Sequence, residues 1–131
     1  EQIHMERVLC LLIHYQISDP ASTVVGEFTD PEIQALYNDF VDQGEICLLE
    51  ALDVGASIED MDIYDLNILL GQTENVAIIS IFENILCGSE NHLRSFYDLL
   101  DKRGVEYLPQ YLTQDELNAI IESDDLRCVL N

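Results

Sequence analysis

Basic residues are scarce in this sequence. Of its 131 residues, five are Lys or Arg and 26 are Asp or Glu, so the formal net charge is −21. Five scattered cations cannot neutralise a row of phosphates or hold an anionic membrane surface. The composition therefore excludes nucleic acid and membranes as expected partners and favours cations, either metal ions or basic proteins. For most of the carboxylates the alternative is a solvated surface that aids solubility.

Long apolar runs and paired cysteines are also missing. The sequence has no stretch of about 18 uncharged apolar residues that could span a membrane, and none of its segments is expected to be a signal peptide. We expect a soluble protein, whether cytoplasmic or exported. None of the cysteines forms a C-x-x-C pair, so they indicate small buried residues or one disulfide rather than a zinc site. The cysteines are Cys10, Cys47, Cys87 and Cys128.

Hydrophobic residues make up 48% of the chain and recur with a helical period almost throughout. This pattern predicts one all-α domain over residues 1–131 with a core of its own. We expect helices over residues 1–17, 45–70 and 75–103, a short helix that starts within residues 29–32 and ends near Gly44, and a short last helix after Thr113.

Turn and capping residues predict how these helices connect. Thr29 and Glu32 have capping-box spacing, with a proline in the first turn. The connection after Gly71 is short, so the two long helices should form an antiparallel hairpin. Residues 105–112 are predicted to form an extended segment that leads to the last helix, which begins with a capping box at Thr113.

Ionisable and polar residues interrupt the apolar face of each of the three longest helices. Spacings of three and four residues define these faces. The interrupting residues are Glu1 and His4 in the first helix, Glu59 and Asp62 in the 45–70 helix, and Ser89 and His92 in the 75–103 helix.

A buried carboxylate needs a partner, a proton or a metal. One divalent ion bound from three helices would satisfy these groups together, and the Glu1-x-x-His4 spacing places two ligands on one helical face, as in di-iron and di-manganese bundles. Two alternatives remain open. Glu59 and Asp62 form a water-accessible polar patch at a bundle end, or His92 is a core histidine that bonds to a neighbour.

The predicted hairpin gives a rough check of this hypothesis. Folding it about Thr73 leaves Glu59 about 7.5 Å from the level of His92 along the helix axis, which long side chains bridge only with difficulty. Glu83, beside the apolar face, is an alternative contributor. His14 lies off the first apolar face and is predicted to be at the surface or an interface.

Five stretches of the sequence, in order, resemble an uncharacterised ferritin-like family, a domain of unknown function found in bacteria and archaea. They cover nearly the whole chain. The stretches are Glu1-Gln-Ile-His4-Met, residues 26–37 (GEFTDPEIQALY), residues 50–66 (EALDVGASIEDMDIYDL), residues 88–96 (GSENHLRSF) and residues 107–112 (YLPQYL).

The resemblance implies a ferritin-like antiparallel helix bundle, plus two short helices, in which Glu1, His4, Glu59 and His92 occupy ligand positions. It also implies that the first bundle helix is missing here. The last bundle helix has Ser89 where many ferritin-like proteins have Glu, and Asp62 is the residue expected to compensate for this loss. A single-metal or vacant site is therefore an alternative to two ions.

The leading functional hypothesis is a metal-binding protein with iron or manganese, because oxygen ligands dominate the set; zinc is the other alternative. If two irons bind, we expect oxygen or peroxide to oxidise Fe(II) there. Glu59 would then be a bridging ligand, and His4 and His92 would be terminal ligands. The competing hypothesis is a metal-free structural or protein-interaction module.

The absence of one bundle helix would leave an apolar groove, and exposed grooves of that size usually find a partner. We expect either the same groove of a second copy, in a homo-oligomer, or an N-terminal segment to fill it.

Overall fold

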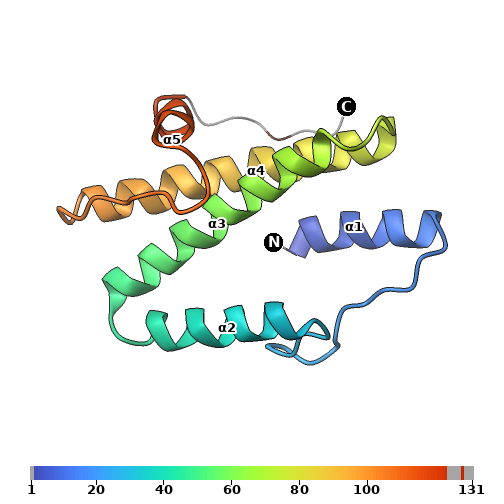
Figure 1. Cartoon of the computed structure of the whole chain (residues 1–131), viewed down its shortest axis with the longest axis horizontal. Helices are drawn as coiled ribbons and strands as arrows, with labels where there is room; N and C mark the ends of the chain where they lie inside the picture. The colour runs from blue at the N-terminus through green and yellow to red at the C-terminus, as the bar shows by residue number, and fades with distance from the viewer. Residues whose placement is uncertain (1, 124–127, 129–131) are drawn as a thin grey trace.

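A computed structural model of the chain describes residues 2–123 and 128 (Figure 1). Within them the chain forms five α-helices and no strand, which confirms the predicted all-helical class. The helices are α1 (Gln2–His14), α2 (Pro31–Gly44), α3 (Leu48–Leu70), α4 (Val76–Asp101) and α5 (Gln114–Ile121).

The two longest helices, α3 and α4, form the predicted antiparallel hairpin and pack along each other (Figure 1). Gly71 ends α3, and the Asn75 side chain caps α4 by accepting hydrogen bonds from two backbone N–H groups of its first turn. Farther along the hairpin, Gly55 faces the ring of Phe96. A Cβ at Gly55 would lie 2.5 Å from that ring, so this close approach of the helices requires glycine.

Two helix boundaries differ from the prediction by three residues. The first helix ends at His14 rather than Ile17, because Gln16 adopts a left-handed conformation with φ of 56°. A left-handed residue is a common way to end a helix. The third helix begins at Leu48, three residues later than predicted, because the backbone at Cys47 is still extended.

The two predicted capping boxes had different outcomes. At α2 the prediction was wrong, because Asp30 is the cap and the Thr29 hydroxyl donates to the Pro20 carbonyl at 3.0 Å instead. A carboxylate at this position also interacts favourably with the positive end of the helix dipole. At α5 the capping box between Thr113 and Glu116 is confirmed.

The hydrophobic core lies between α3, α4, α5 and the segment before α5. Two residues of that segment, Tyr107 and Leu112, belong to it. The buried core residues are Leu52, Ala56, Ile63, Leu93, Leu100, Tyr107, Leu112, Leu117 and Ile120.

A buried carboxylate fastens residues 105–112 to α3. Asp60 has no exposed surface. Its Oδ2 accepts hydrogen bonds from the Tyr107 hydroxyl at 2.9 Å and the Gln110 backbone N–H at 2.6 Å, and its Oδ1 accepts from the Leu112 N–H at 2.8 Å. Burial, reinforced by the nearby Asp60 carboxylate, raises the pKa of Tyr107 well above its usual value.

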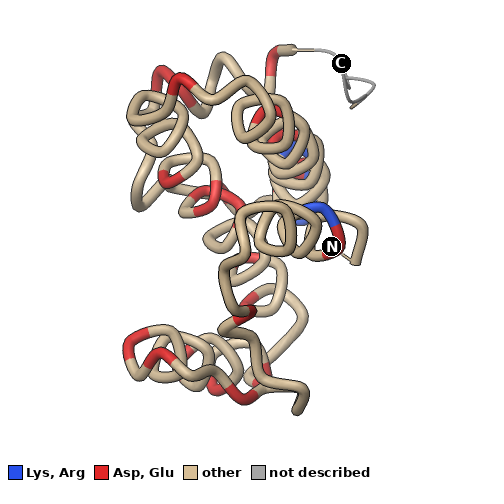
Figure 2. Tube along the Cα trace, turned by 90° about the vertical axis from the view of Figure 1, so that its right-hand side faces the viewer, with Lys and Arg blue, Asp and Glu red and all other residues tan. Residues whose placement is uncertain are grey.

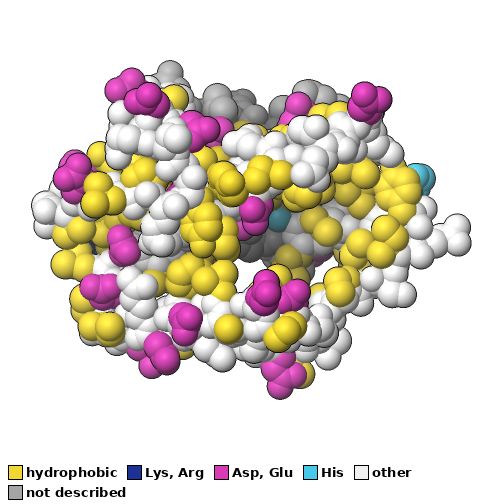
Figure 3. Space-filling view, viewed as in Figure 1, with side chains coloured by type: hydrophobic (Ala, Val, Ile, Leu, Met, Phe, Trp, Pro, Cys, Tyr) yellow, Lys and Arg dark blue, Asp and Glu magenta, His cyan; other side chains and the backbone are white. Residues whose placement is uncertain are grey.

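Helices α1 and α2 bury no residue completely. Among the described helices, α1 packs on α4 and α2 packs on α3, and no Cα atom of α1 lies within 8 Å of one in α2. Ile3 and Ile13 of α1 are 62% and 67% exposed. Figure 3 shows hydrophobic side chains around a hollow between α1, α2 and α3, with acidic and histidine side chains visible inside it. An apolar groove is therefore present on this face.

One disulfide joins α4 to the C-terminal part of the chain, between Cys87 and Cys128. The disulfide alternative for the cysteines is confirmed for this pair. Cys10 and Cys47 are exposed thiols, so the prediction of small buried residues was wrong for those two.

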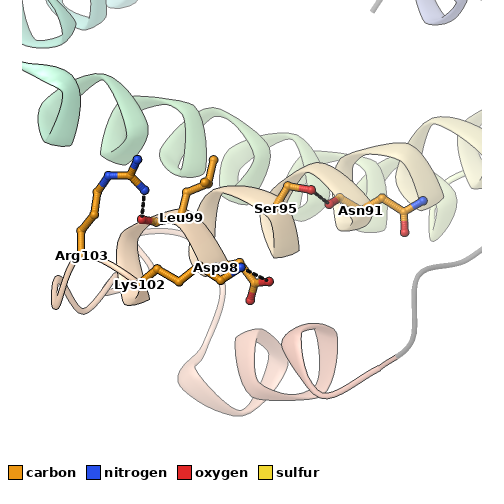
Figure 4. A network of polar contacts seen from close by, with 6 residues as sticks. All are labelled: Asn91, Ser95, Asp98, Leu99, Lys102 and Arg103. Carbon is orange, nitrogen blue, oxygen red and sulfur yellow. Dashed lines mark hydrogen bonds and ion pairs between the residues drawn. The ribbon is translucent and has the colours of Figure 1, made fainter.

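Two positive charges, Lys102 and Arg103, directly follow the C-terminal end of α4 (Figure 4). Arg103 donates to the Leu99 carbonyl at 2.7 Å, and Lys102 lies 3.5 Å from the exposed carboxylate of Asp98. Cations at this end satisfy unpaired carbonyls and interact favourably with the helix dipole. Acidic residues, in contrast, occur on every described helix, whereas the Lys and Arg residues among residues 2–123 lie on α1, on α4 and just after α4 (Figure 2). Nowhere in the described residues is a helix both long and apolar enough to cross a membrane.

Candidate functional site

Glu59 and His92 meet between α3 and α4. Glu59 lies two turns after the buried Leu52, and its side chain is 10% exposed, against 43% for His92. Nδ1 of His92 lies 3.2 Å from Oε1 of Glu59. A carboxylate accepts hydrogen bonds, so this contact holds a proton on Nδ1. Such a bond fixes the orientation of the imidazole and raises the basicity of Nε2.

This contact spans the separation that the sequence predicts. Glu59 and His92 are expected about 7.5 Å apart along the helix axis, yet their side chains meet at 3.2 Å. Side chains lean toward the N-terminus of their own helix. In an antiparallel pair, His92 therefore leans toward the turn and Glu59 leans away from it, which shortens the distance that straight helices would leave.

Helix α1 brings His4 to the same place. It runs antiparallel to α4, with His4 against Gly88 and the Tyr15 hydroxyl accepting from the Asn75 side chain at 2.6 Å. A Cβ at Gly88 would lie 2.5 Å from Cε1 of His4. The centroids of the His4 and His92 rings are 6.4 Å apart. The lack of a side chain at Gly88 therefore lets His4 lie close to His92.

The remaining residues that the sequence analysis singled out differ in how far they are buried. Asp62 is half-buried on α3, one turn after Glu59, and Ser89 is buried on α4. Glu1 lies outside the described residues. His14 is exposed, which confirms that it lies at the surface.

The described residues do not by themselves make up a metal site. Within residues 2–123 and 128, no three His, Cys, Asp or Glu side chains are close enough together to hold one ion. The alternative contributor Glu83 is exposed. Glu59 and His92 form a contact pair, and His4 lies beside it. Carboxylate and imidazole groups are suitable ligands for iron, manganese and zinc. The side-chain types present here are therefore compatible with metal binding.

Four buried polar residues were missed from the sequence: Ser57, Asp60, Asn84 and Arg94. Asp60 was overlooked because it is the neighbour of Glu59 and falls off the face predicted to be buried. In fact α3 is buried on two sides. One side packs on α4, and the other, which carries Ser57 and Asp60, faces residues 105–112. The small residues at 55–57 are the signal that could have revealed this second buried face. Arg94 and Asn84 on α4 are 7% and 3% exposed, and no sequence pattern marks them.

Arg94 organises the region beside the disulfide. Its guanidinium donates to the Ile120 carbonyl at 3.0 Å and to the Ser123 hydroxyl at 2.9 Å. It also donates to the side-chain oxygen of Asn91, whose amide in turn donates to Sγ of Cys128 at 3.3 Å. Arg94 therefore holds the end of α5 against α4.

Glu90 lies one turn before Arg94. Its pKa is raised by burial, and the charge of Arg94 offsets part of that increase.

The fold and the site together define an all-helical protein in which a carboxylate–histidine pair lies inside a helical hairpin and a second histidine comes from a third helix. The family model described as "Uncharacterized protein domain (DUF2202)" matches residues 1–124. This chain therefore belongs to that family.

A relative supports the assignment. Uncharacterized protein MJ0754 of Methanocaldococcus jannaschii is 41% identical over 128 residues, which are 97% of this chain and 69% of the relative. A crystal structure of hypothetical protein MJ0754 from Methanococcus jannaschii is similar to this fold, with a TM-score of 0.92 and 40% identity. The similarity covers 95% of this chain and 72% of the crystallised chain.

Proposed function

We propose that this chain is a metal-binding protein with a ferritin-like bundle, and that Glu59, His92 and His4 form the basis of its metal centre. The contact between Glu59 and His92, with His4 beside it, carries the proposal. Burying a carboxylate is costly unless charge or hydrogen bonds compensate it. A cation shared by these residues would supply that compensation, and the strongly acidic chain would concentrate cations around it.

The donor set favours iron or manganese over zinc, because carboxylates contribute along with the imidazoles. Glu1, which precedes α1, and Asp62 are the further ligands we assign to the centre. Bound iron would supply redox chemistry toward oxygen or peroxide, of which Fe(II) oxidation is the simplest case. The chain's own contribution is positional: Glu59 orients His92, and Gly88 leaves room for His4.

Manganese binding tests this proposal. The protein is stripped of metal and titrated with Mn²⁺, and the unbound ion is followed by electron paramagnetic resonance. We expect saturable binding that is weakened at least about tenfold in Glu59→Gln and in His92→Gln. Glu74→Gln, in the exposed turn between α3 and α4, is the matched control and should bind like the parent. Equal binding by the parent and a Glu59→Gln, His92→Gln double variant would contradict the proposal.

A second candidate function is that of a helical interaction module. It is favoured by the absence of any fully buried residue in α1 and α2 and by the hydrophobic side chains around the hollow in Figure 3. A second copy of the chain would cover this surface in a homo-oligomer. Light scattering coupled to gel filtration is expected to give the mass of a dimer or larger assembly. A monomer at high protein concentration would count against self-association.

A further inference from the structure

The side chain of Asn84 is an exception among the buried polar groups of the described residues. Asn84 is 3% exposed, and neither its Oδ1 nor its Nδ2 has a hydrogen-bond partner. A carboxamide has one acceptor and two donors, and burying all of them without partners is both rare and costly. An orphaned amide of this kind needs an explanation, and a ligand that completes its hydrogen bonds is one.

Asn84 lines a pocket between α1 and α4. The cavity has a volume of about 320 Å³, near the lower end of the range for small-molecule sites. The Cys87–Cys128 disulfide contributes to one wall. The described lining residues are Ile3, His4, Arg7, Asn84, Gly88, Asn91, His92 and Cys128.

The described residues that line this pocket differ in charge from the chain as a whole. Asp and Glu outnumber Lys and Arg by 26 to 5, yet the described lining contains Arg7 and no carboxylate. Within the part of the chain that the structure describes, no carboxylate pairs with Arg7. An unpaired guanidinium beside a cavity is suited to binding an anion, and its planar shape matches a carboxylate.

We propose that this pocket binds a small monocarboxylate that carries a hydroxyl group. The ligand carboxylate would pair with Arg7. Its hydroxyl, which both donates and accepts, would satisfy Oδ1 and Nδ2 of Asn84 together. A single cation matches a single negative charge, and the surplus of acidic residues disfavours anions of higher charge. The pocket shares His4 and His92 with the candidate metal centre, but the proposal goes beyond metal binding, because it depends on Asn84 and Arg7, which do not belong to that centre.

Three probes of similar size separate these contributions. Lactate has both the carboxylate and the hydroxyl, propionate lacks the hydroxyl, and lactamide lacks the charge. Each is titrated into ¹⁵N-labelled protein that a chelating resin has stripped of metal, so that binding does not depend on the metal centre. Lactate should produce saturable shifts of the Asn84 side-chain amide and the Gly88 backbone amide. Propionate and lactamide should bind at least about tenfold more weakly.

Two variants and a control assign the contacts. Asn84→Leu keeps the approximate size and removes the orphaned polar atoms, so it should fold at least as stably as the parent and lose about tenfold or more in lactate affinity. Arg7→Gln should weaken lactate binding by a similar factor and leave the weak lactamide binding unchanged. Asn67→Leu, at an exposed position of α3, should bind lactate like the parent.

Several results would overturn the proposal. Lactate shifts that do not saturate, or that persist in Asn84→Leu and Arg7→Gln, would show that the pocket is not the site. Equal affinity for propionate and lactate would remove the role assigned to the hydroxyl. Tighter binding of inorganic phosphate than of lactate would assign the pocket to another class of anion.

Discussion

The attachment of residues 105–112 to α3 depends on one side chain, which makes Asp60→Ala an informative perturbation. The Asp60 carboxylate accepts hydrogen bonds from the Tyr107 hydroxyl and from the backbone N–H groups of residues 110–112. Alanine would leave all four donors without an acceptor. Water cannot replace the carboxylate without opening this part of the core, because Asp60 and Tyr107 are almost completely buried.

The expected loss in the free energy of unfolding is about 4 kcal/mol, since each unsatisfied buried donor costs at least about 1 kcal/mol. Asp60→Asn keeps the size and one acceptor oxygen but turns an amide N–H₂ toward a backbone donor, so we expect a loss of about 2 kcal/mol. Tyr107→Phe removes a single bond and should cost about 1 kcal/mol. Against a typical total of about 5–15 kcal/mol, the alanine variant would be severely destabilised.

Urea unfolding followed by far-ultraviolet circular dichroism, with the disulfide oxidised, measures these differences. Asp65→Asn, at an exposed position of the same helix, is the control and should change the stability by less than about 0.5 kcal/mol. If Asp60→Ala were no more destabilised than Asp65→Asn, the assignment of Asp60 as the attachment point would be refuted.

Three further predictions concern other parts of the fold. Gly88→Ala should displace His4 from α4 and cost about 1–3 kcal/mol; unchanged His4 ring signals in nuclear magnetic resonance spectra would argue against the packing described. Because the pKa of Tyr107 is raised in the folded state, its contribution to stability should be complete below about pH 10 and decline above it as the unfolded chain ionises. Urea midpoints measured across that range should fall less steeply in Tyr107→Phe, and parallel curves would contradict this. Replacing Cys87 and Cys128 by serine should cost about 4 kcal/mol, as expected for a sequence separation of 41 residues; a parent protein insensitive to thiol reductant in the same assay would disprove a stabilising disulfide.

Much of the fold could be predicted because its signals are local. The helical period located all five helices, and Gly71 and the Thr113 capping box marked boundaries that the structure confirms. The end of α1 was missed because the left-handed conformation of Gln16 is not a preference of glutamine. The cap at Asp30 was missed because Thr29, its neighbour, is also a good cap residue.

The site was less predictable, because its contacts join distant parts of the sequence. Periodicity placed Glu59 and His92 on inward faces, but their contact also depends on how side chains lean in an antiparallel pair. Asp60 could not be assigned a role, because its partners lie 47 to 52 residues away. The orphaned amide of Asn84 is a property of packing alone.

The loose attachment of α1 has a consequence for any ligand that contacts it. This helix carries both His4 and Arg7, yet it buries no residue completely, and α4 is its one helical neighbour among the described elements. Binding that bridges α1 and α4 therefore requires the docked form of α1, and the apparent affinity equals the intrinsic affinity reduced by the docked fraction. Substitutions in residues 18–29, between α1 and α2, could then tune affinity through this equilibrium without altering any atom that touches the ligand.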